Sequence, residues 1–416
     1  MDFNKRSRKA NALFASSAGV IQQLVQIVGN FAYRTIFLYF LSEEYLGING
    51  LFSNVLQLFS LAELGIGSAI LYSMYQPFAQ QDVKQISALI GFYKRVYNFL
   101  AILVVALGLL FYPFLSTIGN VSEIPSDVNL TVVYFLFVAQ SAMSYLFVYK
   151  QSLLTADQQS HKISLFTCLL QVVDYTVKIL VLWISKDYVL VLAGSILSSL
   201  LLNWLFSFWI TGKYNSVFKD KQKLDKLSRK KILTHTGGLL CHKIGYIVVT
   251  STDNIILSKF IGLAAVGIYS NYAMIVMAIT NIVNRIVSSL VPTIANYVLK
   301  KSKQDSYILL RRTLFINLWL ASFTTVCLFL LLNPFIRLWL GPDFLLPVSA
   351  VAWICMQHYF QSARLTANTF INSCGLFHLD RFRPLVESAV NLTVSIYLAN
   401  RIGTLSYHYV IYYKSV

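Results

Sequence analysis

The sequence predicts an all-α polytopic membrane protein, and three observations lead to this fold class. Of the 416 residues, 56% are hydrophobic and only 12% are charged, whereas soluble domains have roughly 25% charged residues. Apolar runs of about 20 residues, long enough to cross a bilayer as helices, recur along the whole chain. The runs lack strand-like alternation, and a backbone in lipid must form its hydrogen bonds internally, so we expect helices. This composition excludes a soluble enzyme, a nucleic-acid-binding protein and a disulfide-stabilised secreted domain.

Eleven helical spans are predicted in the order of the chain. Their ranges are 14–41, 46–74, 92–115, 130–154, 163–184, 188–211, 236–257, 264–290, 311–332, 346–373 and 384–402. Several exceed the roughly 20 residues that a bilayer requires, which allows for tilt or for breaks that are buried in the protein. The first apolar run is too long for a cleaved signal peptide.

The distribution of basic residues predicts the orientation of these spans. With the N-terminus in the cytoplasm, the cytoplasmic segments hold 25 Lys and Arg residues and the outer loops hold 4. Membrane proteins concentrate Lys and Arg in cytoplasmic loops, so this asymmetry supports a cytoplasmic N-terminus. Most of the net charge of +17 therefore reflects orientation next to anionic lipid.

The longest basic segment, 213–235, is the best candidate for a cytoplasmic linker between two lobes. It separates an N-terminal lobe at 1–212, which holds spans 1–6, from a C-terminal lobe at 236–416. The C-terminal lobe holds spans 7–11 and a tail. The sequence thus predicts a two-lobed bundle with about eleven spans.

A related segment occurs in both predicted lobes. In each copy a charged residue and an aliphatic run precede a Gly-Ile pair, Gly47-Ile48 in the first copy and Gly267-Ile268 in the second. Both copies leave one span at the outer face and enter the next. Equal orientation of the copies predicts a parallel internal repeat, as in two-lobed transporters.

Polar residues recur at helical spacing inside several spans. The longest series are Gln22, Gln26, Asn30 and Arg34 in span 1, and Gln357, Gln361, Arg364, Asn368 and Asn372 in span 10. Single polar residues join helices, but series of this length are more than helix association requires. They predict a wet cavity that binds a polar solute.

Four bases and four acids lie within the predicted spans. The bases are Arg34, Lys178, Arg285 and Arg364, and the acids are Glu63, Asp174, Asp253 and Glu387. Charge at the middle of a span is costly, so each needs a partner or a function. Arg34 and Arg285 lie about two turns from span ends and could reach the interface by snorkelling, and Lys178 can pair with Asp174 one turn earlier.

The chemistry of these charged groups points to an anionic solute. The planar guanidinium of Arg donates paired hydrogen bonds to phosphate oxygens, while Asn and Tyr suit sugar hydroxyls. The acids are candidates for binding a coupling H⁺ or Na⁺. The sequence has no phosphate-binding loop of the GxxxxGK[ST] type, no CxxC pair and no HxxxH pair, so we predict no cofactor, metal site or catalytic residue. The six His are expected at interfaces or in loops.

Residues 34–79 closely resemble the start of Wzx-like flippases, which transport capsular and exopolysaccharide repeat units. These flippases belong to the multidrug/oligosaccharidyl-lipid/polysaccharide (MOP) superfamily. Residues 251–275 and 383–404 are similar to the seventh and eleventh spans of the same family. The resemblance implies a MATE-like bundle that flips an undecaprenyl-pyrophosphate-linked oligosaccharide to the outer leaflet of a bacterial cell membrane by alternating access.

The resemblance also implies residue roles and partners. Arg34, and with it Arg285 and Arg364, would engage the pyrophosphate, next to Lys178, Gln26, Asn30, Gln361 and Asn368. Membrane lipid, a coupling H⁺ or Na⁺, the polysaccharide polymerase and other assembly proteins would be partners. Members of the superfamily have at least twelve spans, whereas the polar segment 401–416 is too short for one, so we expect a truncated twelfth span.

Two other functions fit parts of the sequence. A cation-coupled drug antiporter of the MATE type would favour acids over Arg in its cavity, and this chain has both. A membrane polymerase or ligase acting on lipid-linked sugars is the enzyme alternative, but the predicted outer loops are short for a catalytic role.

Overall fold

The computed structural model describes most of the predicted helical regions of the chain. The described residues are 8–59, 66–115, 125, 127–220, 222–225, 229, 255, 258–259, 262–288, 294, 297–298, 302–374, 383, 385–390 and 393. They divide into two compact units. Unit 1 comprises Met1–Leu263 with Pro384–Val416, and unit 2 comprises Ala264–Arg383. The structure describes 213–220, 222–225 and 229 of the predicted linker, 213–235, and the predicted division into lobes stays a prediction.

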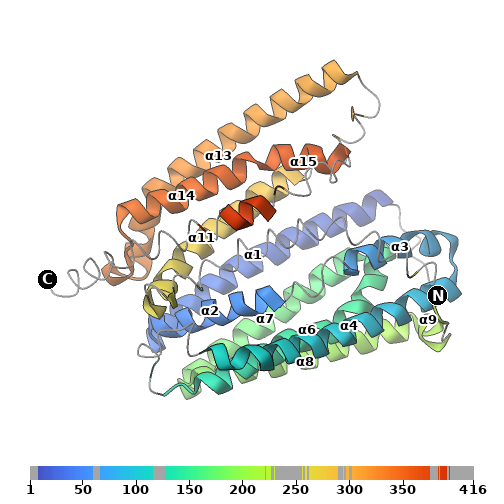
Figure 1. The fold of residues 1–416 in the computed structure, drawn as a ribbon, viewed down its shortest axis with the longest axis horizontal. Helices are drawn as coiled ribbons and strands as arrows, with labels where there is room; N and C mark the ends of the chain where they lie inside the picture. Colours follow the sequence, from blue (N-terminus) through green and yellow to red (C-terminus); the bar gives the residue numbers. More distant parts are fainter. Residues whose placement is uncertain are drawn as a thin grey trace. The chain divides into compact units, whose positions relative to one another are not determined.

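Every regular element within the described ranges is a helix (Figure 1). In unit 1 these are α1 (Arg8–Phe40), α2 (Glu43–Phe59), α3 (Ile66–Gln80), α4 (Val83–Phe111), η2 (Tyr112–Phe114), α6 (Leu130–Ala156), α7 (Ser160–Ser185), α8 (Tyr188–Lys213) and α9 (Asn215–Lys219). In unit 2 they are α11 (Leu263–Ser288), which begins at the unit boundary, α13 (Lys303–Trp339), η4 (Pro342–Phe344), α14 (Val348–Ala363) and α15 (Leu365–Cys374).

Four of the long helices begin at side-chain caps. Asp82, Asn129, Asp187 and Ser302 each accept a hydrogen bond from a backbone N–H in the first turn of the following helix. The first N–H groups of a helix have no hydrogen-bond partner within the helix, and these capping side chains accept hydrogen bonds from them. An unsatisfied N–H group is especially costly in a membrane protein. The caps of α4, α6 and α8 therefore set where these helices leave their short connecting loops.

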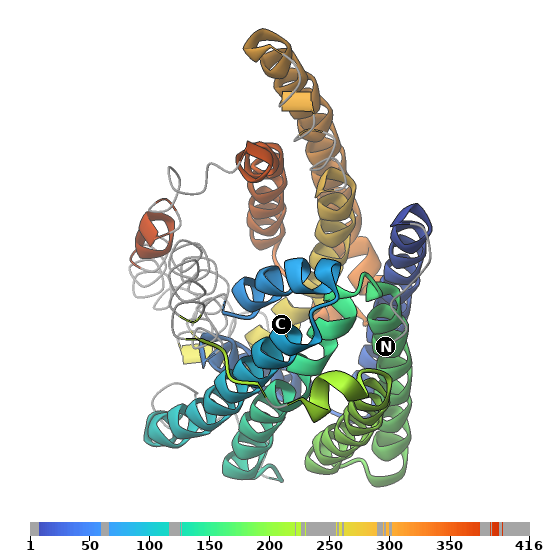
Figure 2. The same cartoon turned by 90° about the vertical axis from the view of Figure 1, so that its right-hand side faces the viewer.

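Neighbouring helices of unit 1 pack in a continuous series. Along this series α3 contacts α4, α4 contacts α6, α6 contacts α8, α8 contacts α7, and α7 contacts α1. The long helices lie side by side in the ribbon view (Figure 1) and in the view turned by 90° (Figure 2). Aromatic side chains fill much of the core: Phe37 packs edge-to-face on Tyr188, and Phe52 on Tyr134. In this series α7 lies between α1 and α8 and packs on both.

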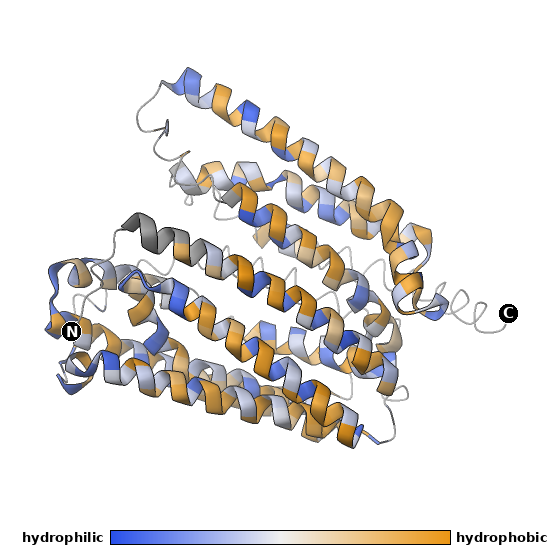
Figure 3. Ribbon diagram, turned by 180° about the vertical axis from the view of Figure 1, so that it is seen from behind, coloured by the Kyte–Doolittle hydropathy of each residue, from blue (hydrophilic) through white to orange (hydrophobic). Residues whose placement is uncertain are grey.

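Six described helices are long and apolar enough to cross a membrane. They are Val83–Phe114, Leu130–Ala156, Ser160–Ser185, Tyr188–Lys213, Leu263–Val287 and Lys303–Trp339. Large apolar side chains on them are exposed, such as Leu197 and Phe208 on α8 and Phe315 and Trp319 on α13. Figure 3 shows hydrophobic residues along most of the length of these helices. Extended apolar surfaces of this kind are stable in lipid, so the chain is a multi-pass membrane protein.

The predicted spans that lie within the described residues correspond to helices, but two of them differ from the prediction. Nearly all of 236–257 and most of 384–402 lie outside the described residues. The range 46–74 is occupied by α2 and α3, with 60–65 outside the described residues. The range 346–373 is not one helix, because α14 ends at Ala363 and α15 starts at Leu365. Arg364, predicted near the middle of a continuous span, instead lies at this break.

The related segments of the predicted repeat occupy equivalent places in their helices. Gly47 is the fifth residue of α2, and Gly267 is the fifth residue of α11. Gly47 also permits a close approach, since a Cβ placed there would lie 2.1 Å from the carbonyl oxygen of Leu263. The local match supports the expected repeat at these two helix starts.

One expectation about histidine is wrong. The six His were expected at interfaces or in loops, but the side chain of His358 is only 1% exposed and lies in the middle of α14. It is held by hydroxyl groups from two other helices. The polarity of a histidine does not reveal that it is buried when its hydrogen-bond partners, here Thr280 and Thr324, come from distant parts of the sequence.

Candidate functional site

The polar series of span 1 lies on α1, where it meets α7. Gln26, Asn30 and Arg34 are partly buried at successive turns of α1. Along α7, the polar residues Gln171, Asp174 and Lys178 are partly buried as well. Since α1 packs along α7, the two helices bring these predicted site residues into one region of unit 1.

Tyr175 joins the two polar series. Its phenol donates to the Asn30 side-chain oxygen at 2.8 Å and to the Gln26 backbone carbonyl at 3.4 Å. Gly29 makes this contact possible, because a Cβ at that position would lie 2.2 Å from two carbons of the Tyr175 ring. Tyr175 was not among the predicted site residues, and only its place between Asp174 and Thr176 on a polar helix face could have suggested it.

Asp174 lies at the centre of a second network on α7. One carboxylate oxygen is 2.6 Å from the Lys178 ammonium, and the other accepts a hydrogen bond of 2.5 Å from Ser195 on α8. The pair expected from i,i+4 spacing is thus formed, and the Asp174 and Lys178 side chains are 17% and 21% exposed. The Lys178 ammonium also lies 5.4 Å from the centre of the Tyr33 ring. The network therefore connects α7 and α8 to α1 next to Arg34.

Arg34 follows Tyr33 directly and lies one turn beyond Asn30. It is the cation that α1 contributes, six residues before the end of the helix at Phe40. This position lies within the apolar length of α1. An arginine beside amide and phenol groups is suited to a solute that combines phosphate with hydroxyls.

Unit 2 holds the polar series of span 10 at the break between α14 and α15. The side chains of Gln361 and Arg364 are exposed, and Asn368 is partly buried. The Asn368 side-chain oxygen accepts a hydrogen bond of 3.0 Å from Arg383. Asn317 of α13 donates to the carbonyl oxygens of Ser362 and Ala363, the last residues of α14. This contact satisfies backbone groups that the break releases.

The remaining predicted site residues are dispersed or outside the described residues. Arg285 is exposed near the end of α11 in unit 2, and Glu387 is partly buried in unit 1. Glu63 and Asp253, both candidates for ion coupling, lie outside the described residues. The structure therefore brings together Gln26, Asn30, Arg34, Asp174 and Lys178, all in unit 1.

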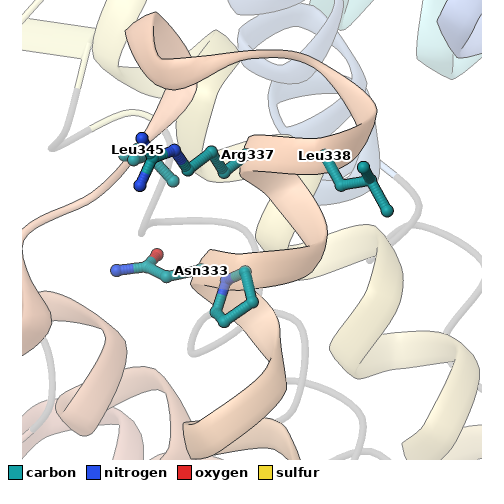
Figure 4. Close-up of a pocket in the computed structure, with 5 residues that line it drawn as sticks. Asn333, Arg337, Leu338 and Leu345 are labelled. Atoms are coloured by element: carbon teal, nitrogen blue, oxygen red, sulfur yellow. The ribbon is translucent and has the colours of Figure 1, made fainter.

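An open pocket of about 640 Å³ in unit 2 was not expected from the sequence. It is lined by Asn333, Pro334, Arg337, Leu338 and Leu345. Figure 4 shows Asn333 and Arg337 projecting from the same side of α13, with Leu345 near Arg337. Asn333 accepts a hydrogen bond of 2.6 Å from Tyr272 of α11 and donates to the carbonyl of Leu346. In the sequence, only the spacing of Asn333 and Arg337 by one helical turn could have indicated this pocket.

Comparison with known families identifies the family of this chain. Residues 9–298 match the family model described as "Polysaccharide biosynthesis protein". The chain belongs to this polysaccharide biosynthesis family. The match covers α1 and α7 with the whole of their polar face, and it confirms the family to which the sequence resemblance pointed. No curated protein sequence matches significantly.

Solved structures with this fold are transporters. An inward-facing multidrug-resistance MATE transporter of the MOP superfamily is 13% identical, with a TM-score of 0.57. The match covers 93% of this chain and 88% of the transporter chain. An outward-facing one is also 13% identical, with a TM-score of 0.57 and coverages of 96% and 95%. A mutant of the Vibrio cholerae MATE transporter VcmN is 12% identical, with a TM-score of 0.53 and coverages of 94% and 87%.

These matches establish the fold of this polysaccharide biosynthesis protein. The predicted all-α, MATE-like membrane bundle is confirmed. Because the inward- and outward-facing transporters match equally well, the similarity does not favour either conformation. The chain is thus a polysaccharide biosynthesis protein with the fold of MATE transporters.

Proposed function

We propose that this transporter flips undecaprenyl-pyrophosphate-linked oligosaccharide repeat units from the inner to the outer leaflet of a bacterial cell membrane. It would act by alternating access, during capsule or exopolysaccharide assembly. The observation that carries the proposal is the polar face of α1 and α7 within apolar helices. Tyr175 bonds Asn30, Lys178 of the Asp174–Lys178 pair lies over the Tyr33 ring, and Arg34 follows Tyr33 on α1.

The chemistry of this face suits both parts of the substrate headgroup. A pyrophosphate is an anion whose oxygens accept paired hydrogen bonds from a guanidinium, as Arg34 can donate. Sugar hydroxyls both donate and accept, and the amides of Gln26 and Asn30 and the Tyr175 phenol do the same. The polyprenyl tail needs no polar contact, because lipid surrounds the exposed apolar surface of the helices.

The residues of unit 2 have supporting roles in the proposal. Arg364, Gln361 and Asn368 lie together at the break between α14 and α15, and broken helices in transporters place polar backbone groups near substrates and ions. Arg285 of α11 is a further cation that could contact the anion. Glu63, Asp253, Glu387 and Asp174 stay candidates for a coupling H⁺ or Na⁺.

The bonding of Asp174 distinguishes the proposed flippase from a drug antiporter. A carboxylate that binds a cationic drug must be accessible to it. Both oxygens of Asp174 are instead occupied, one by Lys178 and one by Ser195. The carboxylate of the α1–α7 face is therefore engaged within the protein, which favours an anionic solute over a cationic drug.

A flipping assay with the purified protein in vesicles tests the proposal. The substrate is a fluorescent undecaprenyl-pyrophosphate oligosaccharide, and its appearance in the opposite leaflet is measured by quenching. We expect Arg34→Ala to slow flipping by about 10-fold or more, since a hydrogen bond to a charged group contributes roughly 1.5–3 kcal/mol. Arg34→Lys keeps the charge without the paired donors and should fall between Ala and the wild type.

The matched control is Arg95→Ala. Arg95 is exposed on α4 and bonds only the Gly91 carbonyl of its own helix among the hydrogen bonds described. We expect normal flipping from this variant. Equal flipping by Arg34→Ala and Arg95→Ala would rule out the proposed role of Arg34, and transport of a lipophilic cation in place of the lipid-linked sugar would support the antiporter instead.

A further inference from the structure

His358 connects three helices inside unit 2. Its Nδ1 atom lies 2.9 Å from the hydroxyl of Thr280 on α11, and its Nε2 atom lies 3.0 Å from the hydroxyl of Thr324 on α13. The imidazole is almost completely buried. Both ring nitrogens therefore have a hydroxyl partner, and each partner belongs to a different helix.

The number of protons on these groups determines which of them donates and which accepts in each hydrogen bond. Thr280 also donates to the carbonyl of Val276 at 2.8 Å, and Thr324 donates to the carbonyl of Leu320 at 3.0 Å. Each hydroxyl has one proton but two acceptor positions. If both hydroxyls donate to their own helices, both must accept from His358, which requires the doubly protonated imidazolium.

The neutral imidazole also fits the same place. It donates from one nitrogen and accepts at the other, so one threonine hydroxyl must rotate away from its backbone carbonyl and donate to the ring. That carbonyl keeps its partner in the helical hydrogen-bond ladder. Uptake of one proton from water thus changes one hydroxyl orientation and leaves every nitrogen of His358 hydrogen-bonded in both states.

The exchange of hydrogen bonds reaches two neighbouring helices. A threonine hydroxyl bonded to a carbonyl one turn earlier bends a helix slightly, and releasing the bond relaxes it. Loss of a proton from His358 therefore alters the local geometry of either α11 or α13. A proton-coupled transporter needs a buried group of this kind, with two bonded states that favour different helix positions.

The titratable and charged groups around His358 are few in the described part of unit 2. The thiol of Cys355 lies one turn earlier on α14, and the thiol of Cys327 lies one turn beyond Thr324 on α13. The nearest charged residues along the helices are Arg285, five residues beyond Thr280, and Arg364, six residues beyond His358. An imidazole is the side chain whose unperturbed pKa lies nearest neutral pH, so His358 is the candidate proton-binding group between these helices.

Buried polar oxygens continue from His358 toward the break between α14 and α15. Ser362 and Thr366 follow at one-turn intervals on the same face as His358, and Asn317 contacts Ser362 from α13. The side-chain oxygens of all three are buried and have no hydrogen-bond partner among the described residues. Such oxygens can bond water and relay a proton along the helix.

We propose that His358 is a proton-binding residue whose protonation is coupled to the hydrogen bonding of α11 and α13. Proton binding stands on the geometry of unit 2 alone. Its use in driving transport rests on the proposed flippase function. The ligand is a proton, and the site comprises His358 with the hydroxyls of Thr280 and Thr324.

Nitrogen NMR of the full-length protein in lipid nanodiscs tests proton binding without any substrate. The chain is labelled at the imidazole nitrogens, and His358→Gln assigns one signal pair among the six His. We expect His358 to pass from a neutral to a doubly protonated ring as the pH is lowered. A single neutral tautomer at every pH, in a protein that remains folded, would overturn the proposal.

Variants of Thr324 distinguish a proton site from a purely structural contact. Thr324→Val removes the acceptor at Nε2 and should lower the titration midpoint by about one pH unit, the equivalent of one hydrogen bond to a charged group. Thr324→Ser retains the hydroxyl and should leave the midpoint unchanged. Equal midpoints for the Val and Ser variants would contradict the proposed role of Thr324.

The coupling is measured as flipping with and without an imposed pH gradient. We expect His358→Gln to lose the increase in flipping that a gradient produces in the wild type, whatever its rate without a gradient. A normal response of this variant would overturn the coupling. If no variant flips the lipid-linked sugar but His358 titrates, the proposed substrate is wrong and the proton site stands.

Discussion

Gly29 determines how closely α1 and α7 approach at the candidate site. The Tyr175 ring occupies the space where a side chain at position 29 would lie. We expect Gly29→Ala to displace Tyr175 from Asn30 and to reduce stability by about 1–3 kcal/mol, the usual effect of overpacking. Thermal unfolding in detergent measures this loss.

Gly212 of α8 provides the matched control for that substitution. Nothing lies within 4 Å of a Cβ placed there. Gly212→Ala should therefore be neutral or slightly stabilising, because alanine favours a helix over glycine. Equal melting temperatures for the two alanine variants would show that the contact between Gly29 and Tyr175 is not tight.

Asp174 is held by two partners, and its removal leaves one of them without a counter-charge. Asp174→Asn keeps the shape of the side chain but leaves the partly buried ammonium of Lys178 without its ion pair. We expect a loss of about 1–3 kcal/mol. The double variant Asp174→Asn, Lys178→Met should recover most of it, since removal of both partners leaves no unpaired charge.

The same double variant also tests a role of Asp174 in ion coupling. If the carboxylate only anchors Lys178, the flipping that the stable double variant retains should still respond to H⁺ or Na⁺ gradients. A stable double variant that no longer responds to H⁺ or Na⁺ gradients would instead identify Asp174 as a coupling residue.

The partners within one helix were predictable, and those between helices were not. The i,i+4 spacing of Asp174 and Lys178 alone indicates their ion pair. Ser195 and Tyr33 belong to other helices, and their contacts with this pair depend on how α1, α7 and α8 pack. The same reason explains why Tyr175 was not predicted: its function as a link to Asn30 depends on the glycine opposite it.

At the level of elements, a polar cluster fixes the connection between α6, α7 and the end of α8. Tyr214 follows α8 and donates to Asp157 at 2.6 Å, and Gln159 donates to the same carboxylate at 2.5 Å. Lys213 bonds the Gln159 side chain in turn. All of these groups lie where two loops meet, so the cluster anchors the end of one helix to the turn between two others.

Tyr214→Phe tests the strength of this anchor. Burial, and then the hydrogen bond to Asp157, raise the pKa of the Tyr214 phenol well above its usual value. The phenol is therefore protonated at neutral pH in the folded and unfolded chain, and its contribution to stability is fully present below about pH 10 and is lost as pH rises further. We expect the variant to lose about 1–3 kcal/mol, equally from pH 6 to about pH 9.

The control for Tyr214 is Tyr307→Phe, because Tyr307 is exposed on α13. Its unfolding temperature should match that of the wild type. A Tyr214→Phe variant as stable as the control would mean that water replaces the bond to Asp157, and a loss that grows between pH 6 and 9 would contradict the raised pKa.

Helix positions followed from hydropathy better than helix breaks did. Apolar runs locate α4, α6, α7 and α8 because lipid requires about 20 apolar residues whatever the packing. The break at Arg364 leaves no such signal, since the residues on both sides continue a helical polar series. The break depends on Asn317 of α13, which bonds the carbonyl oxygens at the end of α14.

For the whole molecule, fold and substrate rest on different observations. Transporters that are only 12–13% identical share the fold, so the fold follows from general hydrophobic patterning more than from particular residues. The proposed substrate, in contrast, depends on a few polar groups such as Arg34. The sequence could indicate those groups as costly charges in apolar helices, but not which of them lie together.

The orientation of the whole chain yields the last prediction. The excess of Lys and Arg in alternate loops predicts that the N-terminus and the turn between α3 and α4 lie in the cytoplasm and that the turn after α13 lies outside. Gln85 and Asp343 are exposed at these two turns. In a chain whose own cysteines are replaced, an impermeant maleimide should label Asp343→Cys in intact cells and Gln85→Cys only after permeabilisation. The reverse labelling pattern would place the N-terminus outside. The start of α1 would then face the outside and its end, near Arg34, would face the cytoplasm.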